Sequence, residues 1–140
     1  MKLARACFLM MIGVMSITFI PALYIHMTRY VIPMHQVRSS LSSVNYPTGW
    51  KSTDQIRKDG YGNCKDYSLL LMEKLYPMET QMLITQRPDE ATHAAVLING
   101  VVLDPAFRKV QMYNKYMRSR TLIKKVEYRN MNSYVGKRVL

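Results

Sequence analysis

The chain has 140 residues, of which 49% are hydrophobic, and a formal net charge of +11. This length leaves room for one small domain and excludes a multidomain organisation. Its two cysteines are Cys7 and Cys64, and Cys7 lies in an apolar segment at the start of the chain. A disulfide within the folded domain is therefore excluded.

The first feature in chain order is a long apolar run. No residue from Ala6 to Ile25 is charged, and about 20 apolar residues suffice for a helix that crosses a hydrocarbon layer. A cleavable signal peptide has a shorter apolar stretch and a small-x-small site after it, and no such site follows here. We therefore expect residues 1–29 to form an uncleaved, single-pass membrane anchor. Lys2 and Arg5 favour a cytoplasmic N-terminus and a domain on the non-cytoplasmic side, although the downstream flank is also basic.

The next segment interrupts any regular hydrophobic period. Residues 30–49 contain Pro33, two Ser-Ser pairs, Pro47 and Gly49, residues that are typical of loops. We expect a linker over residues 30–49 and a folded domain over residues 50–140. The domain begins with a short helix over residues 55–58, capped by the Ser52–Asp54 segment.

A longer helix is predicted to start at or beside Cys64. Apolar residues recur with helical spacing at positions 67, 70, 71 and 75, and Pro77 ends the pattern. The glycine-containing segment 59–63 before it predicts a turn.

The rest of the domain is predicted to be mainly strands. The strongest signal is Asn99-Gly100 between two apolar runs, which is typical of a two-residue β-hairpin turn. The predicted elements are a strand over 81–86, a polar loop over 87–90, hairpin strands over 92–98 and 101–103, a basic helix over 108–120 and a strand over 121–128.

Cys64 has the position that a cysteine nucleophile requires. The thiolate is the reactive form, and the N–H groups and dipole at a helix N-terminus lower the pKa of a thiol there. The same N–H groups can donate to an oxyanion, and Gly60 and Gly62 are expected to let a substrate carbonyl approach closely. An inert buried thiol remains the alternative interpretation.

The base must come from His93, because the other two histidines, His26 and His35, fall in the expected anchor and linker. With Asn99-Gly100 as the turn, the register places Ala95 opposite Asp104. Because side chains two residues apart in a strand share a face, His93 and Asp104 are expected to be diagonal neighbours, about 7–8 Å apart at Cα. A carboxylate there can hold one imidazole nitrogen while the other meets the thiol.

These motifs resemble the transglutaminase-like superfamily, and most of all its bacterial cysteine proteinases. The similarity is carried by Gly62-Asn63-Cys64-Lys65-Asp66-Tyr67, by Thr92-His93-Ala94-Ala95 and by Val102-Leu103-Asp104-Pro105, in that order. The resemblance implies an α+β fold of the papain/transglutaminase type, with a nucleophile helix on a small antiparallel sheet. It also implies catalytic roles for Cys64, His93 and Asp104.

The sequence departs from the family pattern beside the cysteine. Asn63 and Lys65 replace acidic residues that are common there. We expect Lys65 to be a solvated lysine of the first helical turn, and Asp66 to favour that turn through the helix dipole. Neither is assigned to catalysis.

The expected function is that of a membrane-anchored cysteine peptidase or amidase acting on a protein or peptide by acyl transfer. The alternatives are a cell-wall amidase or endopeptidase with the same three residues, and a catalytically silent binding module. No metal or cofactor is expected. Residues 108–140 carry ten Lys or Arg and one acid, Glu127, which favours contact with an anionic envelope or lipid surface. The absence of a recognised motif argues against nucleic acid as a partner.

Overall fold

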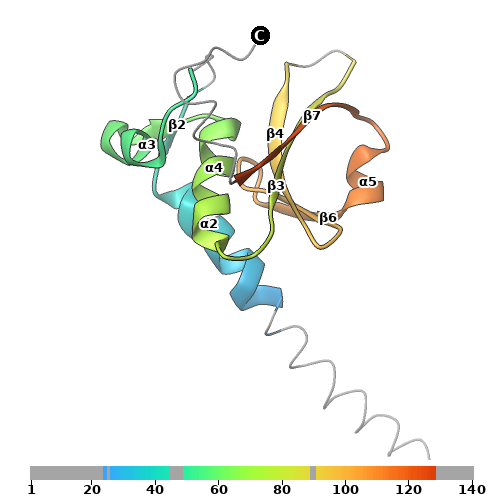
Figure 1. The fold of residues 1–140 in the computed structure, drawn as a ribbon, viewed down its shortest axis with the longest axis horizontal. Coiled ribbons are helices and arrows are strands. Elements are labelled where there is room, and N and C mark those ends of the chain that lie inside the picture. The colour runs from blue at the N-terminus through green and yellow to red at the C-terminus, as the bar shows by residue number, and fades with distance from the viewer. Residues whose placement is uncertain (1–23, 25, 45–48, 89–90, 129–140) are drawn as a thin grey trace, which may run out of the picture.

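The computed structural model describes Tyr24 and residues 26–44, 49–88 and 91–128 (Figure 1). The helical elements are the π-helical turn η1 (Met27–Val31), α2 (Ile32–Ser39), α3 (Thr53–Asp59), α4 (Cys64–Leu75) and α5 (Tyr113–Met117). The strands are β1 (Ser42–Ser43), β2 (Tyr61–Gly62), β3 (Gln81–Gln86), β4 (His93–Ile98), β5 (Val101–Asp104), β6 (Lys109–Met112) and β7 (Thr121–Glu127).

The centre of the domain is a five-stranded antiparallel sheet with the order β6-β5-β4-β3-β7. Helices α2, α3 and α4 lie on one side of this sheet, and α5 lies on the other (Figure 1). The larger core joins α2 and α4 to one sheet face, whereas Tyr116 of α5 packs with Leu83, Ala95 and Val102 on the opposite face. The α+β class with a small antiparallel sheet is therefore confirmed.

The β4–β5 hairpin has the predicted register. Val96 faces Leu103 and Ile98 faces Val101. Asn99 and Gly100 both have positive φ, at 48° and 76°, which is the backbone that a tight hairpin of this hand requires and that Asn-Gly adopts readily. The local chemistry of the turn thus determines which residues share a face in both strands.

Helix α4 begins where the sequence predicts, at Cys64. The Asn63 side chain accepts hydrogen bonds from the N–H groups of Lys65 and Asp66, while the Asp66 carboxylate accepts one from the N–H of Asn63. This reciprocal capping box satisfies donors that a helix N-terminus otherwise leaves free. Beyond the cap, Leu71 and Leu75 are almost fully buried, so the apolar face of α4 fixes it on the sheet.

The expectation of a linker over residues 30–49 is wrong for its first part. Residues 32–39 form α2 instead, which follows directly on η1 and has Pro33 as its second residue. Met34, Val37 and Leu41 are buried in the main core. Residues 42–43 then form β1, which pairs in parallel with β2. The folded unit therefore begins before the expected boundary at residue 50.

The predicted helix over 108–120 is also only partly right. Residues 109–112 form β6, which continues the antiparallel pairing with β5 up to Asp104 opposite Lys109. The helix α5 is confined to Tyr113–Met117. Pairing with an existing sheet edge satisfies the backbone of 109–112, and this tertiary contact outweighs the local preference.

The predicted membrane anchor, residues 1–29, lies for the most part outside the described residues. Among the residues that the structure describes, no helix combines the length and the apolar character needed to cross a membrane.

Candidate active site

The structure brings Cys64, His93 and Asp104 together. His93 is the first residue of β4 and Asp104 the last residue of β5, so the antiparallel hairpin places both at the same end of the sheet. Nε2 of His93 lies 2.8 Å from Oδ2 of Asp104, and both side chains are largely buried. The His93 side chain also hydrogen-bonds the Cys64 thiol. The imidazole therefore lies between the thiol and the carboxylate, as the hairpin register predicts.

The carboxylate of Asp104 is fixed by two donors. One oxygen contacts His93, and the other, Oδ1, accepts a hydrogen bond of 3.3 Å from the backbone N–H of Phe107. Asp104 is 4% exposed, so little water competes for these oxygens. With Nε2 of His93 engaged by Asp104, Nδ1 is the ring nitrogen left to face the sulfur.

The electrostatics of the site favour a thiolate–imidazolium pair. Burial alone would raise the pKa of the Cys64 thiol, but the hydrogen bond and positive charge of His93 outweigh it, so the pKa is lowered. Backbone N–H groups of Ala94 and Lys65 act in the same direction. Burial would likewise lower the pKa of His93, but its hydrogen bonds to Asp104 and Cys64 raise that pKa to about 9. A low thiol pKa beside a high imidazole pKa is typical of a reactive cysteine.

The backbone before Cys64 is held by close packing around Gly62. A Cβ at this position would lie 2.8 Å from the Cβ of Asp66 and 3.1 Å from a methyl group of Leu41. Glycine is therefore needed for the approach of β2 to the first turn of α4. Gly60 has a different role, because it ends α3 with a left-handed φ of 70°. Both glycines therefore have roles in the fold of this segment.

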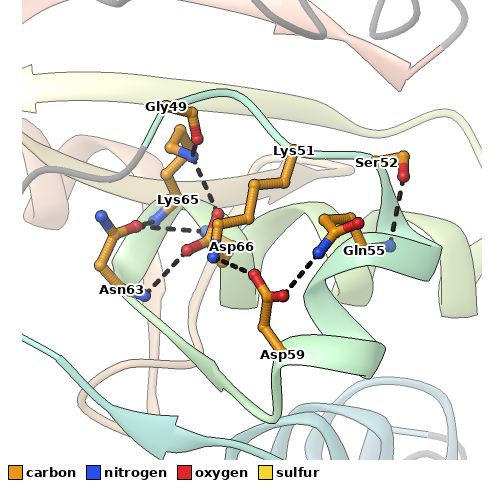
Figure 2. Close-up of polar contacts among 8 residues, drawn as sticks. All are labelled: Gly49, Lys51, Ser52, Gln55, Asp59, Asn63, Lys65 and Asp66. Carbon is orange, nitrogen blue, oxygen red and sulfur yellow. Dashed lines mark hydrogen bonds and ion pairs between the residues drawn. The ribbon is translucent and has the colours of Figure 1, made fainter.

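Lys65 is buried rather than solvated, contrary to expectation. Its ammonium donates to the Gly49 carbonyl and to Oδ1 of Asp66, both at 2.8 Å (Figure 2), and it lies 5.1 Å from the centre of the Trp50 ring. Only 9% of Lys65 is exposed, and Asp66 is fully buried. Lys65 thus attaches the segment containing Trp50 to the helix turn that contains Cys64.

A neighbouring polar network holds the start of the same segment. Lys51 donates to Oδ2 of Asp59, and Gln55 donates to Oδ1 of the same carboxylate, each at 2.6 Å (Figure 2). The Ser52 side chain caps α3 by accepting from the N–H of Gln55. The segment from 49 to 55 is therefore attached to the first turn of α4 through Lys65 and to the end of α3 through Lys51.

Helix α2 contacts both parts of the site through Arg38. Arg38 donates to the hydroxyl of Tyr67 at 3.2 Å and to the carbonyl of Ala106 at 3.4 Å, and its guanidinium lies over the Tyr67 ring. Tyr67 belongs to the helix of Cys64, while Ala106 belongs to the loop that follows Asp104. Arg38 therefore connects the two parts of the site.

The sequence did not point to Phe107. Its ring lies 5.1 Å from that of His93 between centroids, with 36° between the planes, and 60% of the residue is exposed. The Asp104-Pro105 dipeptide indicates a turn, and an Asp side chain that accepts the N–H three residues later follows from such a turn. The position of the ring depends on how the loop folds, which no local pattern specifies.

No protein-family model matches this chain, and neither a curated protein nor a solved structure matches it. Function must therefore be inferred from the side chains at the N-terminus of α4 and at the end of the β4–β5 hairpin.

Proposed function

We propose that the chain is a cysteine hydrolase acting on peptide or amide bonds, with Cys64 as nucleophile, His93 as general base and acid, and Asp104 as the residue that orients His93. One observation carries the proposal: a single imidazole hydrogen-bonds both a thiol at a helix N-terminus and a buried carboxylate. This arrangement supplies an activated sulfur, a proton carrier and a fixed ring orientation together.

The proposed reaction proceeds by acyl transfer in two stages. The Cys64 thiolate attacks the substrate carbonyl, and the imidazolium of His93 gives its proton to the leaving amine as the C–N bond breaks. A thioester and a neutral imidazole remain. Water then attacks the thioester, His93 takes one proton from it, and Cys64 leaves as thiolate with the carboxylic acid released. An amine in place of water would give transfer of the acyl group.

The oxyanion formed in each stage needs hydrogen-bond donors. We infer that the backbone N–H of Cys64 supplies one, because it lies in the first turn of α4, where the helix dipole favours negative charge. A second donor from the Trp50–Gln55 segment is supported by the contacts of Lys65 with Gly49 and Trp50.

The fold is proposed to be of the papain/transglutaminase type. The chain order Cys64, His93, Asp104 and a helix packed on a small antiparallel sheet support this assignment. We also propose that the domain works beside a membrane, on the non-cytoplasmic side, because residues 6–25 carry no charge.

Thiol reactivity provides the first test. The full-length chain with Cys7→Ser, which leaves one thiol, is treated with iodoacetamide at pH 7, and the rate is compared with that of a free cysteine peptide. An ordinary thiol is only a few per cent ionised at this pH, so we expect Cys64 to react about 10-fold faster. His93→Ala should bring the rate down to that of the peptide. Equal rates for the wild-type thiol and the peptide would favour the catalytically silent binding module.

Turnover provides the second test. Casein-derived peptides and purified cell-wall fragments are offered separately to the full-length chain and to Cys64→Ser, and the released amines are measured. Amine release by the chain with Cys64, and none by Cys64→Ser, is the expected result. The fragment that is cut separates a general peptidase from a wall amidase or endopeptidase.

A further inference from the structure

Phe107 is an exposed aromatic ring in direct contact with the imidazole of His93. The ring centroids are 5.1 Å apart and 60% of Phe107 is exposed. Isolated exposed apolar side chains are common on protein surfaces and need no special explanation. The contact with His93 sets Phe107 apart, because any group that lies against the free part of this ring also lies beside the imidazole.

The loop that carries this ring is held at the peptide group that joins Ala106 to Phe107. The N–H of Phe107 donates to Oδ1 of Asp104, and the carbonyl of Ala106 accepts from Nε of Arg38. Pro105 is buried, and Arg108 has a left-handed φ of 55°. On the other side of Phe107, Lys109 pairs with Asp104 at the start of β6. The backbone is therefore held before and after Phe107, so the ring is presented to solvent at little entropic cost to a ligand that binds it.

The position beside His93 determines which half of a substrate can reach the ring. During acylation the imidazolium delivers a proton to the leaving nitrogen, so the leaving amine must approach His93. The acyl half remains bonded to the sulfur of Cys64. A ring in contact with the imidazole therefore lies beside the path of the amine half of the substrate.

We infer that Phe107 forms the subsite for an apolar, preferably aromatic, side chain on the amine side of the scissile bond. This inference rests on the proposed cysteine hydrolase function and adds a substrate class to it. Contact between two aromatic rings contributes about 0.5–1.5 kcal/mol beyond the area that they bury. The free part of the Phe107 ring offers that contact, and the ammonium of Lys109, 5.9 Å from the ring centre, lies on the same ring.

Competition between acceptors tests the subsite without a known substrate. p-Nitrophenyl acetate is the probe for the full-length chain at pH 8, where the Cys64 thiolate attacks the ester, forms an acetyl thioester and releases p-nitrophenolate. Glycinamide, leucinamide or phenylalaninamide then competes with water for the acetyl group. By microscopic reversibility these amines occupy the site of the leaving amine, and the ratio of acetylated amide to acetate measures their binding there. This ratio does not depend on how fast the thioester forms.

The expected result is a preference of about 3- to 10-fold for phenylalaninamide over glycinamide, the range that an aromatic contact provides, with leucinamide between them. Phe107→Ala should reduce the preference for phenylalaninamide over glycinamide to less than about twofold. Phe107→Leu should keep the preference for leucinamide over glycinamide. Met112→Ala is the matched control, because Met112 is similarly exposed at 63% but lies at the far end of the β5–β6 pair. It should retain the wild-type preference.

The outcomes separate the inference from the function that it rests on. In one outcome, Cys64 takes up the acetyl group and releases p-nitrophenolate while the three amides capture the acetyl group equally. In that case the subsite is wrong and the hydrolase proposal stands. A preference that survives Phe107→Ala also overturns the subsite. If no acetyl thioester forms on Cys64, both proposals fail together.

Discussion

Replacing Asp104 with asparagine isolates the effect of its charge. The substitution preserves the shape of the side chain, and an amide oxygen can still accept the N–H of Phe107 that now bonds Oδ1. The second amide position then presents an NH2 group to Nε2 of His93, where a carboxylate oxygen lies at 2.8 Å in the wild-type chain. The imidazolium loses its anionic partner, so we expect the pKa of His93 to fall and the pKa of Cys64 to rise.

The magnitude follows from the pKa of His93. Its rise from 6.5 to about 9 corresponds to about 3 kcal/mol in favour of the charged imidazole. Asp104 and Cys64 produce this rise against the opposing effect of burial, and the Asp104 hydrogen bond is the larger of their contributions. Loss of the Asp104 charge should therefore cost the thiolate–imidazolium pair roughly 2 kcal/mol, which reduces its population up to about 30-fold.

The assay is the rate of Cys64 alkylation by iodoacetamide as a function of pH. Between pH 6 and 7 the ion pair supplies the thiolate, so Asp104→Asn should slow alkylation by up to about 10-fold, which brings the rate close to that of the free cysteine peptide. Above pH 10 the thiol is ionised with or without a partner, and the two rates should converge. The inflection that His93 causes near pH 9 should move down by about 1.5 pH units as part of a coupled titration.

The control removes a carboxylate elsewhere. Asp54→Asn changes a side chain that is 95% exposed and pairs with exposed Arg57, so the alkylation profile should match that of the wild-type chain. The reasoning is refuted if Asp104→Asn and Asp54→Asn give the same profile. It is also refuted if the alkylation rate of the wild-type thiol rises only at about pH 8.5, the pKa of an ordinary cysteine.

Three further predictions concern the scaffold of the site. Gly62→Ala should lower the free energy of unfolding in urea by about 1–3 kcal/mol, because the new Cβ overlaps Asp66; Gly49→Ala, which meets nothing within 4 Å, should leave it unchanged. Lys65→Met should lower the free energy of unfolding by about 3 kcal/mol, because the buried Asp66 carboxylate loses a cation at 2.8 Å. Equal urea midpoints for this variant and the wild-type chain would contradict that. A chain that begins at Gly49 lacks α2 and the buried side chains of Met34, Val37 and Leu41, each worth about 1.5–3 kcal/mol. It should show no cooperative urea transition by circular dichroism, and a wild-type transition would contradict the role given to α2.

The parts of the fold that local chemistry determines could be predicted. Asn99-Gly100 fixes a two-residue turn, and the turn fixes the register that places His93 and Asp104 on one face. The helix of Cys64 could be placed because an apolar period and a closing proline bound it. Both elements need only interactions between residues close in the chain, which a single sequence reveals.

The linker prediction failed because loop-forming residues outnumbered a weak helical signal. Met34, Val37 and Leu41 recur with the spacing of one helix face, which is the signal that could have indicated α2. Pro33 was interpreted as a break, although the helical backbone runs from η1 through Pro33 into α2. The helix is stabilised mainly by packing into the core, and packing partners distant in the chain are not visible in a local pattern.

Lys65 was misjudged for a related reason. A lysine in the first turn of a helix is usually solvated, and its own neighbours in the chain gave no other indication. Its burial depends on the Gly49 carbonyl, 16 residues away, and on the Asp66 carboxylate. Burying an ammonium is favourable only when its donors are satisfied, so the segment at Gly49 has to fold against α4 before this position is stable.

The site consists of two locally determined units whose relative position is set by contacts far apart in the chain. One unit is the capped helix of Cys64, and the other is the hairpin with His93 and Asp104. Arg38 bonds Tyr67 in the first unit and Ala106 beside the second. In the proposed reaction, a misplacement of about 1 Å between reacting groups would cost about 100-fold in rate. By joining the two units, α2 helps to set the distance between the thiol and the imidazole. The segment that looked least structured in the sequence therefore helps to hold the two units in place.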